Sequence, residues 1–438
     1  MNSLRLRLAT ATATALVVAA LPLLAACQAK QESIGYEGPY KKEVSAAIPA
    51  IEKSIGLKFK RMPRVETKSK DEVRTFLEKK FDEDQPALEL AGAERAYKLL
   101  GLLPDSLNLR SFMLGLLAEQ VIGYYDPSTK VLYVVAGDGS AKGAPSADVI
   151  NITITHELVH ALQDQYLGLD SLAKVHGDND RQTAAQSVIE GQATFEQLGI
   201  MLGGSSFAVN LPGGWDRVRQ TIRDSQGSMP IFSSAPMLVQ ETLLFPYLSG
   251  ADFVRRAKEK LKPGEPLYTR MPTSTEQVLH PEKLLDSLDK PLRITLPKPS
   301  GATVIYENDL GEFETRLFLY QHLNDIATAQ RGAMGWGGDR YVAVNTPQGA
   351  GVSWLTMWDS AVQAARFRDL MERVIEKRFG TTPGSGGAGE MRRFTGKGRT
   401  LELVSAMVRG HPSVLFTDVP VGASTRIIDL AKVTLGTP

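Results

Sequence analysis

Two histidines and a glutamate at helical spacing are the residues of this chain best suited to chemistry. They are His156, Glu157 and His160, which form the pattern H-E-x-x-H. On a helix, residues four apart project from the same face, so two neutral imidazoles can bind one metal ion through one ring nitrogen each. Glu157 follows the first ligand on an adjacent part of the helix surface, where it can act as a general base without being a ligand. The pattern therefore predicts a metal site beside a carboxylate that can activate water.

A third ligand is expected at Glu190, thirty residues after His160. Two histidines and one glutamate leave a coordination position for water, whereas structural zinc sites usually close with four protein ligands, many of them cysteines. This ligand set therefore favours catalytic Zn²⁺, which would polarise a carbonyl group and lower the pKa of water, with Glu157 carrying the proton to the leaving group. A fourth protein ligand, such as His176, would instead indicate a structural site.

Both halves of the site are expected on helices. Ser146 suits the N-cap of the first helix and Gly168 suits its end, with apolar residues at helical spacing between them. The β-branched run 152–155 opposes this assignment, but a buried helix tolerates such a run. The second helix is expected to begin at a cap formed by Asp180 and to end at the glycine pair 203–204.

The two segments together resemble the thermolysin-like zinc metallopeptidases, the gluzincins. The resemblance rests on H-E-L-V-H followed by a helical Glu in E-G-x-A, and it covers about 50 residues. It implies a zincin-like fold, hydrolysis of peptide bonds, Zn²⁺ held by His156, His160 and Glu190, and Glu157 as general base. In that family an aspartate four residues after the glutamate ligand orients a histidine. Thr194 occupies this position here, so the partner of His156 is left open.

The resemblance also implies a donor that stabilises negative charge on the carbonyl oxygen, because gluzincins usually supply a His or Tyr from a later segment. His280, in the segment 275–281, is the predicted catalytic donor, and Tyr247 is the alternative. His280 precedes a proline, which favours an extended conformation from which the ring can point into a cleft. A polar cap or a surface histidine is the competing interpretation.

The N-terminus is typical of an exported bacterial lipoprotein. Residues 1–26 combine arginines with an apolar run that is short for a membrane span of about 20 residues. The sequence Leu-Ala-Ala-Cys that ends at Cys27 resembles a lipobox, and Cys27 is the only cysteine. Acylated Cys27 and a tether over 27–41 would anchor the protein in the bacterial cell envelope, at the outer membrane if the host has one. Ordinary secretion is the alternative.

The whole chain is also loosely similar to a group of exported bacterial proteins with the H-E-x-x-H motif, mostly uncharacterised. The similar segments are 124–127, 272–281 and 335–339. A net charge of +1 gives no basic footprint for nucleic acid. The expected partners are therefore a peptide or protein substrate and the membrane, the latter through the N-terminal lipid.

The fold class predicted is α+β, with a zincin-like catalytic region over 42–305 and a small C-terminal α+β domain over 306–438. The catalytic region is expected to contain helices at 43–55, 70–81, 87–102 and 107–119, and strands at 57–67, 120–125 and 131–135. The C-terminal domain is expected to follow a β-β-α-β-β order, with strands at 341–344, 352–358, 399–408 and 413–418 around a helix at 360–379.

The predicted hairpin directly before the motif helix has two interpretations. Its second strand, 130–135, either forms a sheet edge that pairs with an extended substrate, or packs on the helix without a binding role. Two other functions also remain open for the chain. One is a non-catalytic envelope lipoprotein with a structural metal site, and the other is a binding or assembly factor acting through the C-terminal domain, where His322 and His411 are isolated.

Overall fold

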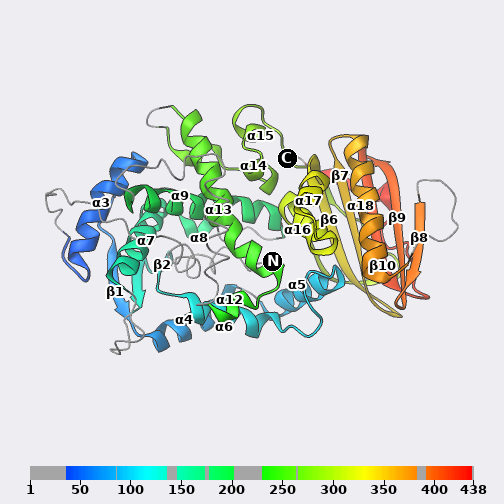
Figure 1. Cartoon of the computed structure of the whole chain (residues 1–438), viewed down its shortest axis with the longest axis horizontal. Helices are drawn as coiled ribbons and strands as arrows, with labels where there is room; N and C mark the ends of the chain where they lie inside the picture. The colour runs from blue at the N-terminus through cyan, green and yellow to red at the C-terminus, as the bar shows by residue number, and fades with distance from the viewer. Residues whose placement is uncertain are drawn as a thin grey trace.

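A helical lobe and a sheet lobe lie side by side along the long axis of the molecule (Figure 1). The computed structural model describes residues 36–84, 86–135, 146–172, 177–201, 229–262, 265–381 and 391–436. Cys27 and His176 lie outside these ranges, as do the expected signal peptide over 1–26 and most of the expected tether over 27–41. The expected mixture of helices and strands, with a sheet near the C-terminus, is confirmed. Within the described ranges, no helix combines the length and apolar character needed to span a bilayer.

The helical lobe contains the predicted hairpin, but its strands are arranged differently from the expectation. The three-stranded sheet has the order β1-β3-β2, formed by β1 (Arg64–Lys68), β3 (Val131–Val135) and β2 (Gly123–Asp126). Because β1 pairs in parallel with β3 and β2 pairs antiparallel with it, β3 has a partner on both edges. The prediction that 130–135 is an open edge is therefore wrong, and β2 is the edge strand of the hairpin.

The helices expected before the motif are all present, with ends that differ by a few residues. They are α3 (Lys41–Ile55), α4 (Lys70–Asp84), α5 (Ala87–Leu99) and α6 (Leu109–Gln120). Pro49 lies inside α3 without ending it. The strand expected over 57–67 is shorter in the structure, because β1 begins only at Arg64.

Helix α7 (Ala147–Leu167) carries the H-E-x-x-H motif and has both predicted ends. The Ser146 hydroxyl accepts a hydrogen bond from the Val149 amide, and Gly168 adopts the left-handed conformation with φ 64°. The hydroxyls of Thr153 and Thr155 donate to carbonyls one turn earlier, at 2.9 Å each. These bonds satisfy the threonine hydroxyls inside a buried helix, which is how α7 accommodates its β-branched run.

The second site helix, α9 (Asn179–Met201), packs against the long helix α13 (Met237–Lys260). Asp180 does not cap α9, contrary to the expectation. The Asp178 side chain accepts from the Arg181 amide at 3.0 Å, and Asp309 from the other lobe accepts from the Asp180 amide at 2.7 Å. Asp180 lies within the first turn, and its carboxylate accepts from the Thr275 amide instead. The expected end at 203–204 lies outside the described residues.

Short helices connect the larger elements of the helical lobe. They are α8 (Leu169–Leu172), α12 (Pro230–Ser233), the 3₁₀ helix η2 (Leu267–Arg270), α14 (Thr275–Leu279) and α15 (Glu282–Leu285). Pro246 lies inside α13 without ending it.

The sheet lobe is built on six antiparallel strands in the order β5-β6-β7-β10-β9-β8. These are β5 (Thr303–Asn308), β6 (Trp336–Thr346), β7 (Gly349–Trp358), β8 (Met391–Gly396), β9 (Arg399–Val408) and β10 (His411–Pro420). The predicted β-β-α-β-β order is present, and β5 and β8 extend the sheet at its two edges. The segment 335–339 contains the start of β6.

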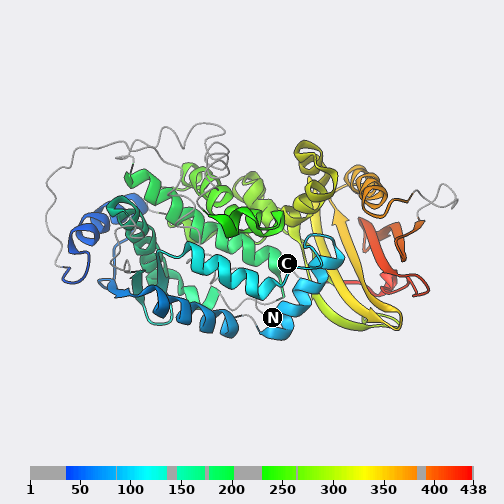
Figure 2. The same ribbon diagram turned by 60° about the horizontal axis from the view of Figure 1, so that its bottom comes forward.

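Helices cover one face of this sheet and the chain terminus covers the other. The helices are α16 (Gly311–Leu323), α17 (Ile326–Ala333) and α18 (Ala361–Phe379), and Figure 2 shows them on one side of the sheet. On the other face, Ile294 from β4 (Arg293–Thr295) and Val433 before β11 (Thr434–Gly436) pack against Val342 and Leu355. Alternating residues of the strands thus fill two separate cores.

Three buried aspartates accept hydrogen bonds from the amides of helix N-termini near the junction of the two lobes. Asp309 accepts from the Asp180 amide of α9 and so links the lobes, Asp180 accepts from the Thr275 amide of α14, and Asp339 accepts from the amides of Leu310 and Gly311 at the start of α16, at 2.9 Å each. Burial raises the pKa of all three carboxyls, and that of Asp339 to about 6. The carboxylates of this junction are therefore engaged in structural bonds with helix N-termini.

Candidate metal centre

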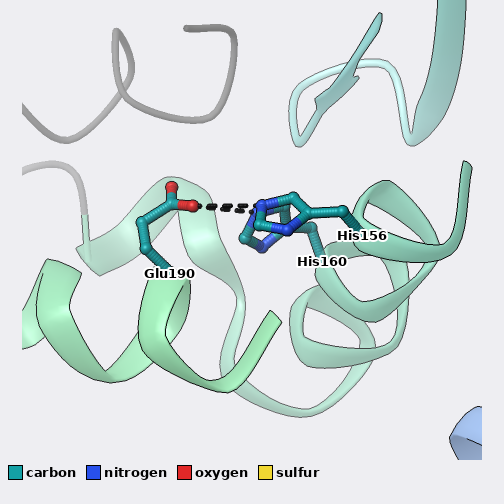
Figure 3. A group of neighbouring side chains, drawn as sticks. All are labelled: His156, His160 and Glu190. Atoms are coloured by element: carbon teal, nitrogen blue, oxygen red, sulfur yellow. Dashed lines mark hydrogen bonds and ion pairs between the residues drawn. The ribbon is translucent and has the colours of Figure 1, made fainter. Parts of the chain in front are cut away.

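The structure brings the three predicted ligands together in one buried group. The Nε2 atoms of His156 and His160 each lie 3.3 Å from the same oxygen, Oε2 of Glu190. Figure 3 shows both rings opposite the end of the Glu190 side chain, with the rings nearly perpendicular at an interplanar angle of 81°. All three side chains are at most 1% exposed. One ligand atom from each residue lies within 4.8 Å of the others, so a single metal ion can be held by all three.

Two glycines allow α9 to pack closely against α13 where the two helices cross. A Cβ atom added to Gly191 would lie 2.2 Å from the carbonyl carbon of Gly250. A Cβ atom added to Gly250 would lie 2.0 Å from the backbone carbonyl oxygen of Ser187. The two backbones are therefore in direct contact at the residue that follows Glu190. This close approach is the physical reason for glycine in the E-G-x-A segment.

Each histidine ligand is oriented by a glutamine. Nδ1 of His156 lies 2.9 Å from Oε1 of Gln197, and Nδ1 of His160 lies 2.8 Å from Oε1 of Gln163. The partner of His156 that the motif comparison left open is therefore Gln197, seven residues after Glu190 on α9. Residues seven apart lie on the same face of a helix, and this spacing is the feature of the sequence that relates Gln197 to Glu190.

The donor set fits a metal ion such as Zn²⁺, which binds imidazole nitrogen and carboxylate oxygen. Nε2 of His160 and Oε1 of Glu190 are buried, yet neither forms a hydrogen bond with any described residue. Buried polar atoms normally have a partner, because an unsatisfied one costs about 1–3 kcal/mol. A metal ion bound between the three side chains would satisfy both atoms.

The charges of the group also suit a cation. Burial lowers the pKa of His156. Burial acts in the same direction on His160, but the adjoining Glu190 carboxylate outweighs it and raises the pKa of that imidazole. Burial alone would raise the pKa of Glu190, whereas the two imidazoles hold it below its ordinary value. A cation bound by this group would compete with protonation of the two imidazoles, because a metal ion binds the neutral ring.

Glu157 lies between the metal ligands and the sheet. Its Oε2 atom accepts a hydrogen bond from the Tyr125 amide of β2 at 2.8 Å, and its side chain is fully buried. The Tyr125 hydroxyl donates to Asp164, one turn after His160, at 2.8 Å. The general-base candidate is therefore held against the edge strand by a backbone donor that the sequence did not reveal.

The two candidate oxyanion donors have different surroundings. Nε2 of His280 bonds Oε1 of Glu312 at 2.9 Å, near the lobe junction where Thr275 meets Asp180. Asp180 precedes Glu190 by ten residues, which corresponds to about 15 Å along the helix. The ring of Tyr247, in contrast, stacks on that of His156, with centroids 6.0 Å apart. Tyr247 is thus the candidate that lies beside the metal-binding group.

A second group of carboxylates has a different explanation. Oxygens of Glu276, Asp289 and Asp359 lie close enough to share a metal ion. The ammonium of Lys283 already contacts all three, at 2.5, 2.8 and 3.0 Å. A lysine therefore provides the positive charge at this position, and the group is structural.

Comparison with known proteins assigns no activity to the chain. A family model described as a domain of unknown function (DUF8575) matches residues 302–410, which corresponds to most of the sheet lobe. No curated protein and no solved structure matches the chain. The matched range excludes His156, His160 and Glu190, so the functional argument depends on the geometry of the site itself.

Proposed function

We propose that the chain is a zinc-dependent peptidase of the bacterial cell envelope, acting on a peptide or protein substrate and anchored through acylated Cys27. The observation that carries the proposal is the convergence of His156, His160 and Glu190 in one buried group. Two histidines and a glutamate are the ligand set of catalytic zinc sites that leave a position for water. The zincin-like character of the helical lobe is part of the same proposal.

Zinc bound by these three residues would supply a Lewis acid for the scissile carbonyl and lower the pKa of the attacking water. Glu157 accepts the proton of that water and delivers it to the leaving amine. The Tyr125 amide holds one oxygen of Glu157, which fixes the direction of the carboxylate. Tyr247, beside His156, donates to the carbonyl oxygen as negative charge develops there.

The substrate backbone is proposed to bind along β2 in place of the strand 130–135. The Val135 amide donates to the Ile122 carbonyl, and the Lys130 amide donates to the Asp126 carbonyl, so residues 122 and 126 face β3. Because successive residues of a strand direct their backbone groups to opposite edges, Gly123 and Tyr125 face outward, toward Glu157. An extended peptide on this edge would pass the general base, and it would pair with backbone groups of β2 other than the Tyr125 amide, which remains bonded to Glu157.

The experiment combines zinc content with cleavage of an unfolded protein substrate. The wild type should bind one zinc ion and cleave the substrate, Glu157→Gln should keep zinc without cleavage, and Glu190→Ala should bind zinc more weakly. A wild-type protein that binds zinc but cleaves no peptide would favour the structural-site alternative. Undiminished zinc affinity in Glu190→Ala would remove that residue from the ligand set.

A further inference from the structure

We propose that Gln163 and Gln197 are positioning residues that fix both histidine ligands with the proton on Nδ1, so that each Nε2 lone pair faces the metal. This inference rests on the proposed function, because it assumes that the group binds zinc. The imidazoles of His156 and His160 are thus oriented by neutral amides and not by carboxylates.

The orientation of Gln163 follows from a backbone carbonyl. Its Nε2 atom donates to the Ile189 carbonyl and to Oε1 of Gln192, at 3.0 Å each. A carbonyl oxygen can only accept, so the nitrogen of the amide must face Ile189 and the oxygen must face His160. That oxygen has no proton to give, and therefore Nδ1 of His160 is the donor in the 2.8 Å bond between them.

A tyrosine extends the same network. The Tyr268 hydroxyl donates to Oε1 of Gln192 at 2.5 Å, so this oxygen accepts from both Tyr268 and Gln163. The network runs from α7 through α9 to η2, and Gln163 and Gln192 are both buried. Because Gln163 also bonds the Ile189 backbone, its orientation is retained without Tyr268. Tyr268 is therefore a matched control at the remote end of the network.

Gln197 offers a simpler contact. Its Oε1 atom lies 2.9 Å from Nδ1 of His156, while its Nε2 atom is buried and bonds no described residue. Replacing that nitrogen with oxygen, as in Gln197→Glu, removes no hydrogen bond that the structure describes. Gln197→Met, in contrast, removes the acceptor and keeps a side chain of similar length.

Neutral partners have a consequence for metal affinity. A carboxylate on Nδ1 makes an imidazole a stronger base and a better ligand, and an amide oxygen does this less. With two amides, the imidazoles donate less charge, and Glu190 is the only anion among the three ligands. The proposal therefore predicts that Gln197→Glu binds zinc at least as tightly as the wild type.

The test measures zinc affinity of the full chain by competition with a chelator. Gln163→Met and Gln197→Met should each weaken zinc binding by about 10–100-fold. Tyr268→Phe should bind zinc as the wild type does, and Gln197→Glu should retain or exceed wild-type affinity. Wild-type affinity in both methionine variants, or a loss in Gln197→Glu equal to that in Gln197→Met, would overturn the proposal.

A second readout requires no substitution and is therefore independent of misfolding. Long-range ¹⁵N–¹H correlations on zinc-loaded wild-type protein should place a proton on Nδ1 of both His156 and His160. A proton on Nε2 of either ring would overturn the proposal while leaving zinc binding intact. A wild-type chain that binds no zinc would instead contradict the metal site of the proposed function, so the two failures are distinguishable.

Discussion

Tyr247 and His280 differ in the partners that the fold gives them. The ring of Tyr247 lies parallel to His156, with an interplanar angle of 19°, and its side chain is 1% exposed. His280 is about one quarter exposed and bonds Glu312, which raises the pKa of the histidine. His280 is therefore engaged in a contact with Glu312 at the lobe junction, whereas Tyr247 lies beside His156 of the candidate metal group.

The prediction at this scale is that Tyr247→Phe lowers kcat by about 10²–10³, the usual cost of one oxyanion donor. Zinc content should not change, because the hydroxyl is not a ligand. His280→Ala is the matched control and should keep kcat near the wild-type value. Steady-state kinetics with measured zinc content distinguish the two. A large loss in His280→Ala beside an unaltered Tyr247→Phe would return the role to the histidine.

The grouping of His156, His160 and Glu190 could be predicted from the sequence because local helix geometry defines it. His156 and His160 are four residues apart, and Glu190 lies in a second recognisable helix. Gln197 and Gln163 could not be predicted as partners, because α9 carries four glutamines and α7 carries two, and only the packing of α7 against α9 selects these two. The difference between Tyr247 and His280 likewise depends on contacts between distant segments.

At the scale of elements, the crossing of α9 and α13 determines where Glu190 lies. Gly191 and Gly250 bring the two backbones into contact, and Tyr247 lies one turn before Gly250 on α13. One crossing therefore positions both a ligand and the proposed oxyanion donor. Any side chain between the helices would move these two residues apart.

Gly191→Ala should destabilise the protein by about 1–3 kcal/mol, the cost of an extra methyl group in a packed interior. It should also weaken zinc binding, because Glu190 moves with the helix. Gly199→Ala is the matched control on α9, since a Cβ there meets nothing within 4 Å, and it should stabilise by about 0.5–1 kcal/mol. Urea unfolding and zinc titration measure both effects. Equal stability of the two variants would contradict the role given to the crossing.

Helix ends were predictable where a single residue determines them, as at Ser146 and Gly168 of α7. The position of β3 was not, because its second partner, β1, lies more than sixty residues earlier in the chain. Alternation of apolar residues shows that a strand is half-buried, but it does not identify the neighbours of the strand. Asp180 illustrates the same limit, since the residue that bonds its amide comes from the other lobe.

At the scale of the whole molecule, the two lobes share hydrogen bonds outside the aspartate junction. Nε2 of His322, on α16, donates to the Leu100 carbonyl at 3.0 Å, and Arg378 on α18 donates to the Leu99 carbonyl. Burial lowers the pKa of His322 to about 4, and the nearby Arg378 acts in the same direction. The folded protein therefore holds this imidazole neutral.

The lowered pKa makes the stability of the folded protein depend on pH. Between the unfolded value of about 6.5 and the folded value of about 4, only the unfolded chain takes up the proton, so stability is lost as pH falls through this window. His322→Gln keeps a donor for Leu100 and removes the titration. Between pH 7 and pH 5, the wild type should lose up to about 2 kcal/mol more unfolding free energy than the variant.

Urea unfolding at the two pH values measures this difference. The two proteins differ only at residue 322, so the comparison isolates His322. Parallel losses in the wild type and in His322→Gln would contradict the pKa assigned to the buried ring. A larger loss in the variant than in the wild type would mean that folding raises the pKa of His322 instead of lowering it.

The sheet lobe was largely predictable as a unit, because its strands alternate regularly and helix α18 has a clear cap at Ser360. The contacts between the lobes were not. They depend on single buried groups, such as Asp309 and Asp339, whose types also suit exposed loops. These contacts have a functional implication, because α9 carries Glu190 and is capped by Asp309 from the sheet lobe.

The most direct test of the proposed peptidase is the rate of peptide hydrolysis per bound zinc ion in the wild type and in Glu157→Gln. Glu157 makes no contribution as a ligand, so both proteins should bind one zinc ion with similar affinity. The wild type should cleave an unfolded protein substrate, and the variant should lose nearly all of this turnover because the proton acceptor is gone. Equal hydrolysis per zinc in the two proteins would contradict the account.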